Sequence, residues 1–246
     1  MKLNRRISGQ IERPADKRRY VRRLFAGVAD RYDLTNDVMS LGLHRRWKRR
    51  LLRLADLRPG HRVLDLAAGT GDLARGVLEL ASRETFEIQV FAADLTPEMM
   101  RIGRAKADAT VDGWIGADAQ RLPFPNGAFD RVLVGYGLRN FPDLDASLAE
   151  SFRCLRPGGR LISLDFGHPD WAALRRVYFG YLNASTRVVG WVLHRDPESY
   201  VYIPESLRRF PGQREIVRRM EATGFEGCGY EDLMMGTMSV NYGDRR

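Results

Sequence analysis

From residue 61 onward, short apolar runs alternate with amphipathic helical patterns, and this alternation constrains the fold of the 246-residue chain more than any other feature. Alternating strand and helix units form a mostly parallel sheet with helices on both faces. Two strand patterns close the chain and predict an antiparallel hairpin on the sheet edge. The sequence therefore predicts an α/β fold with a seven-stranded sheet. The expected strands are 62–67, 88–93, 114–117, 129–136, 160–166, 225–233 and 236–242, and the expected helices are 72–81, 97–107, 144–155, 171–193 and 213–223.

The N-terminal part of the chain differs from the rest in pattern and in charge. Residues 1–16 are expected to form a loose tail, and 17–55 show helical spacing that is interrupted near 34–42. Residues 1–60 carry 17 lysine and arginine residues against 6 acidic ones, whereas the other 186 carry 23 against 25. We therefore expect a basic tail and helical segment over 1–57 and a second domain over 58–246, with a helical insertion at about 170–212.

Several protein classes are disfavoured by what the chain lacks. No apolar run approaches the roughly 20 residues that a membrane-spanning helix needs, and the basic N-terminus has no apolar stretch behind it. Cys154 and Cys228 cannot form a disulfide framework, and neither has a CxxC partner. The four histidines belong to no cluster with metal-ligand spacing. We therefore expect a reduced, cytoplasmic protein with no metal site.

The sequence VLDLAAGTGDLA, which begins at residue 63, predicts a strand, a glycine turn and a helix. Backbone N–H groups at such a turn let a ligand approach closely. Gly69, Gly71 and Ala74 also fit the dinucleotide fingerprint GxGxxA, so the turn alone leaves the ligand open. Asp65 favours a ligand with a cationic amino group, because its carboxylate would repel a pyrophosphate. The alternative role for Asp65 is that of a helix cap.

Further polar segments follow the next strands. Asp94 ends the second strand and is suited to ribose hydroxyls. After the third strand, the carboxylate of Asp118 and the backbone amide of Ala119 suit the amino group and ring nitrogen of an adenine. The fourth strand ends in the sequence GYGLRN, which begins at residue 135. Since ligands of open α/β sheets bind at the carboxyl ends of the strands, these segments predict one shared crevice.

These segments resemble motifs I to III of the class I S-adenosylmethionine-dependent methyltransferases, which have a Rossmann-like fold. Within that class, the chain resembles the ubiquinone/menaquinone biosynthesis C-methyltransferases from about residue 20 to 243. The signatures that carry this resemblance are YDLTNDVMSLGLHRRWK at 32–48, GLRNF at 137–141, and YIPES at 202–206 followed by Phe210 and Pro211. The first signature is long and specific, whereas many families share the glycine motif.

The resemblance implies S-adenosylmethionine as the cofactor. Its cofactor positions fall on Thr70, Asp94, Asp118 and Ala119 of this chain. The family commonly has Asn where Asp118 stands and Ser where Gly135 stands, so a side-chain contact is lost at residue 135. The complete set of predicted cofactor-binding residues is Asp65, Gly69, Thr70, Gly71, Asp94, Asp118, Ala119 and Gly135.

The implied reaction is methyl transfer to a ring carbon of a prenylated quinol. A free phenol has a pKa of about 10, so a base or a cation must favour the phenolate that makes the ortho carbon nucleophilic. The predicted catalytic residues are Arg139, Asn140 and His44, with Asp37, Tyr32 and Tyr202 as partners. A structural salt bridge is the alternative for Arg139, and an exposed helical position is the alternative for His44.

We expect demethylmenaquinol as the acceptor, with the ubiquinone precursor also open. The runner-up is a methyltransferase for another small aromatic or polyketide-like acceptor. A nucleic-acid methyltransferase is disfavoured, because there is no Asn/Asp-Pro-Pro-Tyr sequence and Cys154 is expected within a helix rather than beside a proline. We expect the basic N-terminal helices to act as a lid, and Arg18, Arg19, Arg22 and Arg23 to contact an anionic membrane surface. No nucleic acid is expected as a partner, and a homodimer is left open.

Overall fold

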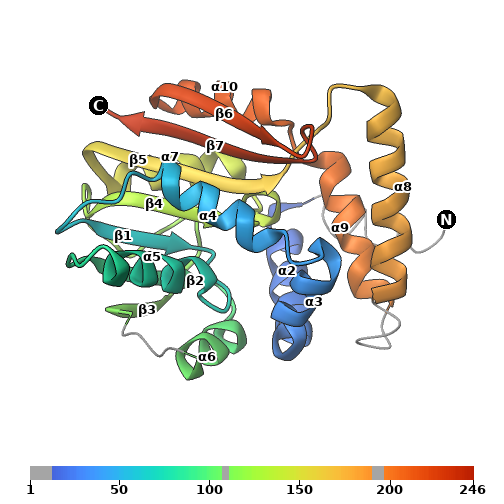
Figure 1. The fold of residues 1–246 in the computed structure, drawn as a ribbon, viewed down its shortest axis with the longest axis horizontal. Coiled ribbons are helices and arrows are strands. Elements are labelled where there is room, and N and C mark those ends of the chain that lie inside the picture. Colours follow the sequence, from blue (N-terminus) through green and yellow to red (C-terminus); the bar gives the residue numbers. More distant parts are fainter. Residues whose placement is uncertain (1–12, 107–110, 190–196) are drawn as a thin grey trace.

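A single mixed sheet crosses the molecule (Figure 1) in the computed structural model, which describes residues 13–106, 111–189 and 197–246. In these described parts seven strands lie in the order β3-β2-β1-β4-β5-β7-β6. Strands β1 to β5 pair in parallel, and β7 is antiparallel to both β5 and β6. This topology confirms the predicted sheet and its C-terminal hairpin. The strands are β1 (Arg62–Leu66), β2 (Gln89–Asp94), β3 (Gly113–Gly116), β4 (Phe129–Gly135), β5 (Leu155–Phe166), β6 (Glu226–Leu233) and β7 (Met238–Arg245).

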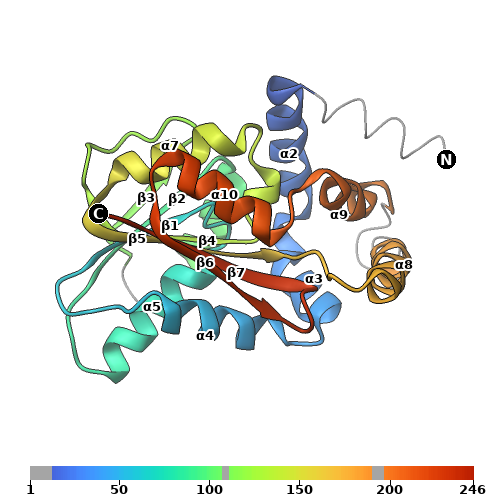
Figure 2. The ribbon, with the colours of Figure 1, turned by 90° about the horizontal axis from the view of Figure 1, so that it is seen from above.

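Helices cover both faces of the sheet, as Figure 2 shows for α4 and α5 on one side and α7 and α10 on the other. Alternate residues of each strand enter different core clusters: Val132 packs with α7 and α10, and Leu133 packs with α4 and α5. This alternation follows from the two-residue period of a strand. The helices that flank the sheet are α4 (His44–Leu54), α5 (Asp72–Arg83), α6 (Pro97–Ala105), α7 (Leu144–Cys154) and α10 (Gln213–Thr223).

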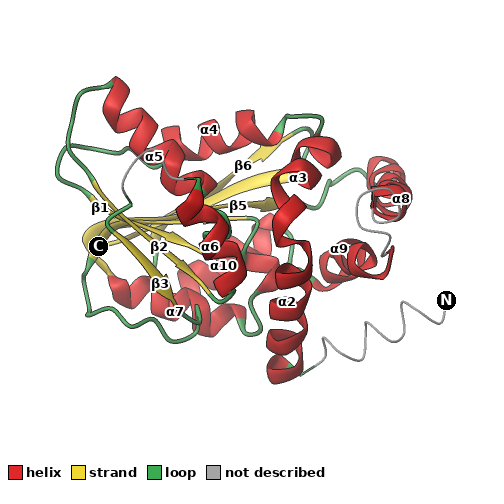
Figure 3. Ribbon diagram, turned by 90° about the horizontal axis from the view of Figure 1, so that it is seen from below, coloured by secondary structure: helices red, strands yellow, loops and turns green. Residues whose placement is uncertain are grey.

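A second group of helices gathers at the carboxyl ends of the parallel strands, where Figure 3 shows α2, α3, α8 and α9 together. Tyr20 of α2 and Tyr202 of α9 pack with their ring centroids 5.4 Å apart, which joins two segments far apart in the sequence. This group therefore covers the edge of the sheet at which ligands are expected. Its elements are α2 (Pro14–Val28), the 3-10 helix η1 (Ala29–Arg31), α3 (Tyr32–Ser40), α8 (Ala172–Val189) and α9 (Pro197–Arg209).

Three predicted boundaries were wrong. The loose tail was expected over 1–16, but α2 already begins at Pro14, a residue type suited to the first turn of a helix. The helical pattern was expected to break over 34–42, but α3 runs to Ser40 and ends at Leu41, which adopts the left-handed conformation (φ 51°). Strand β5 begins at Leu155 rather than at residue 160, because Leu155 already pairs with β4 and the register shifts within the following Arg-Pro-Gly-Gly segment. A bulge with Gly158 at φ 81° lets the strand continue where a turn was expected.

Helix α9 lies within the predicted helical insertion at about 170–212, but no separate helix with its bounds was predicted. Pro204 lies inside it and lacks the N–H group that a helix interior normally uses. Tyr202 and Leu207 are each only 1% exposed, so burial of the helix outweighs the hydrogen bond that the proline removes. The formation of α9 therefore depends on long-range packing, which a local sequence pattern does not show.

The N-terminal helices differ in what they cover. Leu51 and Leu52 of α4 are buried with Val63 and Leu133 in the core of the sheet, so α4 is part of that core rather than of a cover. Helices α2 and α3 lie over the strand ends. The domain division at residue 57 and the insertion at 170–212 stay predictions, and residues 1–12 of the expected tail and 190–193 of the expected helix lie outside the described residues.

Candidate active site

Two adjoining cavities lie at the carboxyl ends of the parallel strands. The smaller one, which we call the inner cavity, is lined by the ends of β1 to β4 and by α2. The larger one, which we call the apolar cavity, has a volume of about 330 Å³ and is lined by α3, α8 and the β6–β7 turn. Phe25, Tyr32 and Tyr136 line both, so the two cavities share a wall.

Asp94 forms the acidic side of the inner cavity. One carboxylate oxygen accepts a hydrogen bond from the N–H of Gly69 (2.8 Å), and the other accepts one from the N–H of Thr96 (2.7 Å). Burial raises the pKa of Asp94, and these backbone donors oppose the rise. A fixed carboxylate keeps lone pairs available beyond these two bonds, which suits a pair of neighbouring hydroxyl groups.

The opposite side of the inner cavity is built from residues after β3 and at the end of β4. Asp118 accepts from the N–H of Gln120 (3.0 Å) and from the guanidinium of Arg18 on α2 (2.8 Å). A Cβ atom at Gly135 would lie 2.9 Å from a methyl group of Leu73, so Leu73 occupies the space that a serine would need. The predicted cofactor residues that line this cavity are Gly69, Asp94, Asp118, Ala119 and Gly135.

The other three predicted cofactor residues lie behind the cavity wall. Asp65 is 1% exposed and accepts from the N–H of Ala74 (2.9 Å), so it caps α5; burial raises its pKa to about 7. The hydroxyl of Thr70 donates to Asp33 (2.8 Å). Gly71 has φ 80° and begins α5. Direct contacts of these three residues with a ligand stay predictions, and for Asp65 the geometry is that of the helix cap.

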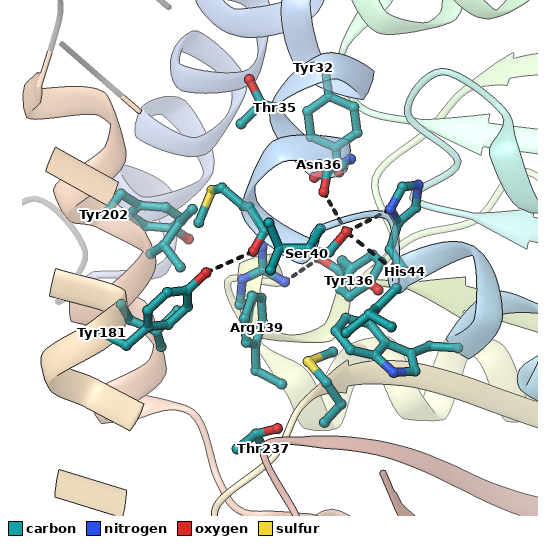
Figure 4. Close-up of a pocket in the computed structure, with 18 of the residues that line it drawn as sticks. Tyr32, Thr35, Asn36, Ser40, His44, Tyr136, Arg139, Tyr181, Tyr202 and Thr237 are labelled. Carbon is teal, nitrogen blue, oxygen red and sulfur yellow. Dashed lines mark hydrogen bonds between the residues drawn. The ribbon is translucent and has the colours of Figure 1, made fainter. Parts of the chain in front are cut away.

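Three buried polar atoms that lack a hydrogen-bond partner within the described part of the chain belong to residues of the apolar cavity's wall: Nδ2 of Asn36, Oη of Tyr136 and Nε of Arg139. All three residues line the cavity, whose wall otherwise consists mainly of aromatic and aliphatic side chains (Figure 4). Leaving a buried polar group unpaired costs about 1–3 kcal/mol. Three such groups around one cavity indicate a ligand with polar oxygens.

Arg139 is held rigidly under this cavity. Its guanidinium donates to Asp165 (2.8 Å) and to the carbonyl of Tyr136 (2.9 Å), and it lies 4.8 Å from the centre of the Phe166 ring. Burial lowers the pKa of Arg139, but the adjacent Asp165 and Tyr32 outweigh this effect and the net shift is upward. The structure thus contains the salt bridge that was the alternative role for Arg139, and Nε is buried without a hydrogen-bond partner in the described part of the chain.

Asn140 and Tyr136 connect the two cavities. The side chain of Asn140 donates to the carbonyl of Tyr136 (3.0 Å) and accepts from the hydroxyl of Tyr202 (3.1 Å). Asn140 lines the inner cavity, whereas Arg139 and Tyr136 line the apolar one. Tyr136 itself adopts φ 60°, and a strained backbone of this kind is most often found at functional sites.

His44, at the start of α4, lines the apolar cavity and is buried rather than exposed on its helix. Its Nδ1 lies 2.8 Å from the hydroxyl of Ser40, and that hydroxyl donates to the carbonyl of Asn36 (2.6 Å). Nδ1 is therefore the donor in this contact, and the basic lone pair of neutral His44 is on Nε2, 3.7 Å from Asp37. Burial and Lys48 lower the pKa of His44, which favours the neutral form.

The model of the ubiE/COQ5 methyltransferase family matches residues 13–245. The chain belongs to that family. A ubiquinone/menaquinone biosynthesis C-methyltransferase from Teredinibacter turnerae is 41% identical over 238 residues, which cover 94% of this chain and 93% of that protein. This family membership confirms the predicted family, the predicted enzyme class and the predicted cofactor, S-adenosylmethionine.

Solved structures agree on the fold. A SAM-dependent methyltransferase from Thermotoga maritima has a TM-score of 0.63 at 20% identity, covering 91% of this chain and 99% of that one. Phosphoethanolamine N-methyltransferase 2 from Haemonchus contortus, in complex with S-adenosyl-L-methionine, has a TM-score of 0.58 at 15% identity and covers 81% of this chain and 52% of that one. The fold of this ubiE/COQ5 family member is therefore the predicted class I methyltransferase fold.

The residues of the inner cavity fit S-adenosylmethionine. Asp94 offers a fixed acceptor for ribose hydroxyls, and Gly69, with φ 56° and no side chain, keeps the turn open. Asp118 can accept from an adenine amino group once Arg18 shares or releases its carboxylate. The roles of these residues stay proposals.

Sequence reasoning did not single out Asn36, Tyr136 or Asp165 for the site. Asp165, near the end of β5, has the one local signal that could have identified it, since it is an acidic residue near the carboxyl end of a parallel strand. Asn36 and Tyr136 lie within quoted signatures, but only the folded structure shows that their polar atoms are buried and unpaired.

Proposed function

We propose that this chain methylates a ring carbon of a prenylated quinol and that demethylmenaquinol is its preferred acceptor. The observation that carries this proposal is the set of three unpaired polar atoms in an apolar cavity that adjoins the inner cavity. The two oxygens of a quinol can pair with these atoms. The fused second ring of a naphthoquinol is apolar and suits a wall rich in Tyr, Phe and Trp side chains.

In this proposal Arg139 stabilises the phenolate. Because its pKa is shifted upward, the guanidinium stays charged at neutral pH, and its unpaired Nε can donate to an oxygen that gains negative charge. Asp165 and the carbonyl of Tyr136 orient the guanidinium, so little reorganisation is needed when the charge develops. The hydroxyl of Tyr136 and the amide of Asn36 are the further donors.

S-adenosylmethionine, when bound, supplies the methyl group on a sulfonium that departs as a neutral thioether. The chain's own part is to position the acceptor carbon and to receive a proton. The phenol proton leaves first. Once the ring carbon carries the methyl group, this carbon releases its own proton and the ring oxygen takes one up, so that one proton is released overall. His44 is the candidate acceptor for the phenol proton, because burial favours its neutral form.

A methyl-transfer assay that offers demethylmenaquinol and a 2-prenyl-6-methoxy-benzoquinol side by side tests the proposal. We expect both quinols to be methylated on carbon and kcat/KM to be higher for demethylmenaquinol. A higher kcat/KM for the methoxy-benzoquinol would overturn the acceptor preference, and methylation of neither would overturn the proposed substrate class. The oxidised quinones serve as controls, since they lack the phenol and should not react.

A further inference from the structure

Exposed apolar side chains are concentrated around the mouth of the apolar cavity. Of the eight large apolar side chains that are exposed in the described part of the chain, seven lie on α3 and its C-terminal turn, on α8, or on the β6–β7 turn. Leu41, Tyr181 and Met234 also line the cavity. We call the seven residues the apolar rim: Leu34, Val38, Leu41, Val177, Tyr181, Met234 and Met235.

The three elements of the apolar rim lie side by side. The hydroxyl of Tyr178 donates to the carbonyl of Thr237 (3.1 Å), which joins α8 to the β6–β7 turn. The hydroxyl of Tyr181 donates to the carbonyl of Met39 (3.2 Å), which joins α8 to α3. Leu34 and Val38 are spaced to share one face of α3, Leu41 follows that helix at its C-terminal turn, and Val177 and Tyr181 share one face of α8. The rim is therefore one surface around one opening.

Three residues of the apolar rim have strained backbone conformations, which cost the folded chain conformational free energy. Leu41, Met234 and Met235 have φ values of 51°, 48° and 56°, in the left-handed region that favours glycine. Leu41 is 82% exposed and Met235 is 74% exposed, so neither side chain recovers that cost by burial within the chain. Strained, exposed apolar side chains at a cavity mouth indicate a contact made with something outside the molecule.

Charge identifies the occupant of this surface. Exposed Arg46 and Arg45, the latter paired with Asp37 (2.9 Å), follow the Leu41 turn, and exposed Arg175 and Arg176 directly precede Val177. Apolar tips bordered by guanidinium groups match an anionic bilayer, in which acyl chains receive the apolar side chains and phosphates receive the arginines. No helix in the described residues is long and apolar enough to cross a membrane, so any such contact is made at the bilayer surface.

We propose that the apolar rim seats on an anionic bilayer, so that the ring of a prenylated acceptor enters the cavity while its tail stays in the lipid. This inference rests on the proposed function. A volume of about 330 Å³ is at the lower end for small-molecule sites and is too small to enclose a long polyprenyl tail as well as the ring. The tail must therefore leave through the opening that the rim surrounds.

The test variant carries Val38→Ser, Val177→Ser and Met235→Ser, because these three rim residues do not line the cavity. The matched control is Trp171→Ser, which removes the eighth exposed apolar side chain (69% exposed) outside the rim. Co-sedimentation is measured without substrate on phosphatidylcholine vesicles with and without phosphatidylglycerol. We expect the full-length chain to bind the anionic vesicles, the triple variant to lose at least about tenfold in partitioning, and the control to match the parent.

A second readout separates this inference from the proposed function. Methyl transfer to a short-tailed, water-soluble demethylmenaquinol should be equal in the parent and the triple variant, whereas transfer to a long-tailed quinol in vesicles should fall with vesicle binding. Equal vesicle binding by the parent and the triple variant would overturn the rim proposal. A rim-dependent dimer with no vesicle binding would also overturn it and assign the surface to a second copy. If the parent chain did not methylate the soluble quinol but still bound vesicles through the rim, the proposed function would be overturned and the rim proposal would stand.

Discussion

Arg139 is a buried cation that is paired with Asp165 and lines the apolar cavity. Because its Nε is unpaired beside the apolar cavity, replacing it should remove a donor that acts mainly when the phenolate forms. We expect Arg139→Ala to lower kcat on the order of 10²–10³-fold, with little change in the affinity for S-adenosylmethionine. Stopped-flow or steady-state transfer assays and calorimetry give the two values.

The Arg139 variant needs a control for folding, since Ala would leave the buried carboxylate of Asp165 without its ion pair (2.8 Å). Arg139→Lys keeps the charge but changes the geometry of the donors. It should fold and still lose most of the activity. If both variants keep near-normal kcat and lose only thermal stability, Arg139 is purely structural.

Asp94 should be the main anionic contact of the cofactor. Asp94→Ala removes the acceptor for two ribose hydroxyls and also releases the N–H groups of Gly69 and Thr96. We expect a loss of about 2–4 kcal/mol in S-adenosylmethionine affinity. Calorimetry on the folded variant measures this loss, and Asp94→Asn, which keeps an oxygen acceptor, should lose less. Unchanged affinity in the Ala variant would contradict the assignment.

Asp65 makes the stability of the chain depend on pH. Burial raises its pKa from 3.8 to about 7, so between these values the unfolded chain has released a proton that the folded chain retains. Stability therefore falls as pH rises through this window. Asp65→Asn removes this loss and can still accept from the N–H of Ala74, so its Tm relative to the parent should rise from pH 5 to pH 8. Asp143→Asn, at the exposed cap of α7, is the control for the same substitution outside the core.

At the scale of elements, α2 is held over the inner cavity by two cations. Lys17 donates to the carbonyl of Phe141 (2.6 Å), and Arg18 pairs with Asp118 (2.8 Å) on the cavity wall. Burial lowers the pKa of Lys17 to about 8. Under the proposed position of the adenine, Arg18 shares or releases the carboxylate of Asp118 when the cofactor binds.

We expect Arg18→Ala to raise both the association and the dissociation rate of S-adenosylmethionine, because the variant removes the ion pair that holds α2 over the cavity. The change in Kd should be smaller than the change in either rate, since both rates rise together. Stopped-flow fluorescence measures the rates. Arg22→Ala, one turn further along α2 and exposed, is the control. Unchanged rates in Arg18→Ala would show that α2 does not limit cofactor entry.

The elements that the sequence predicted well are those with a strong local pattern. Strands β1 to β4 and helices α5, α6 and α7 were placed within a few residues, because the alternation of apolar strands and amphipathic helices is recorded locally. The start and end of α9 within the expected helical insertion were not predicted, because Pro204 opposes the helix locally and the burial of Tyr202 supports it only in the folded chain. In the same way, Asp94 and Asp118 were predictable from the strand ends, whereas the unpaired state of Asn36 and Tyr136 depends on segments about 100 residues apart meeting in space.

At the scale of the whole molecule, basic charge and exposed apolar surface come from different parts of the chain. The excess of arginine and lysine lies in residues 1–60, whereas the apolar rim also draws on α8 and the β6–β7 turn. The sequence alone placed lipid contact on Arg18, Arg19, Arg22 and Arg23. Two of these form ion pairs within the chain, Arg18 with Asp118 and Arg19 with Asp16. Arg22 and Arg23 are exposed.

Two double variants therefore test whether the membrane lies against the apolar rim or against α2. Arg175→Gln with Arg176→Gln removes two charges beside the apolar rim, and Arg22→Gln with Arg23→Gln removes two charges from α2, so the net charge of the two variants is the same. Each charge near an anionic surface is worth about 1 kcal/mol and acts only within a Debye length of roughly 10 Å at 0.1 M salt. If the rim faces the lipid, the α8 pair should reduce partitioning onto anionic vesicles about tenfold or more, and the α2 pair should reduce it less. Co-sedimentation over a series of salt concentrations measures both, and a larger loss for the α2 pair would place the membrane against α2 instead.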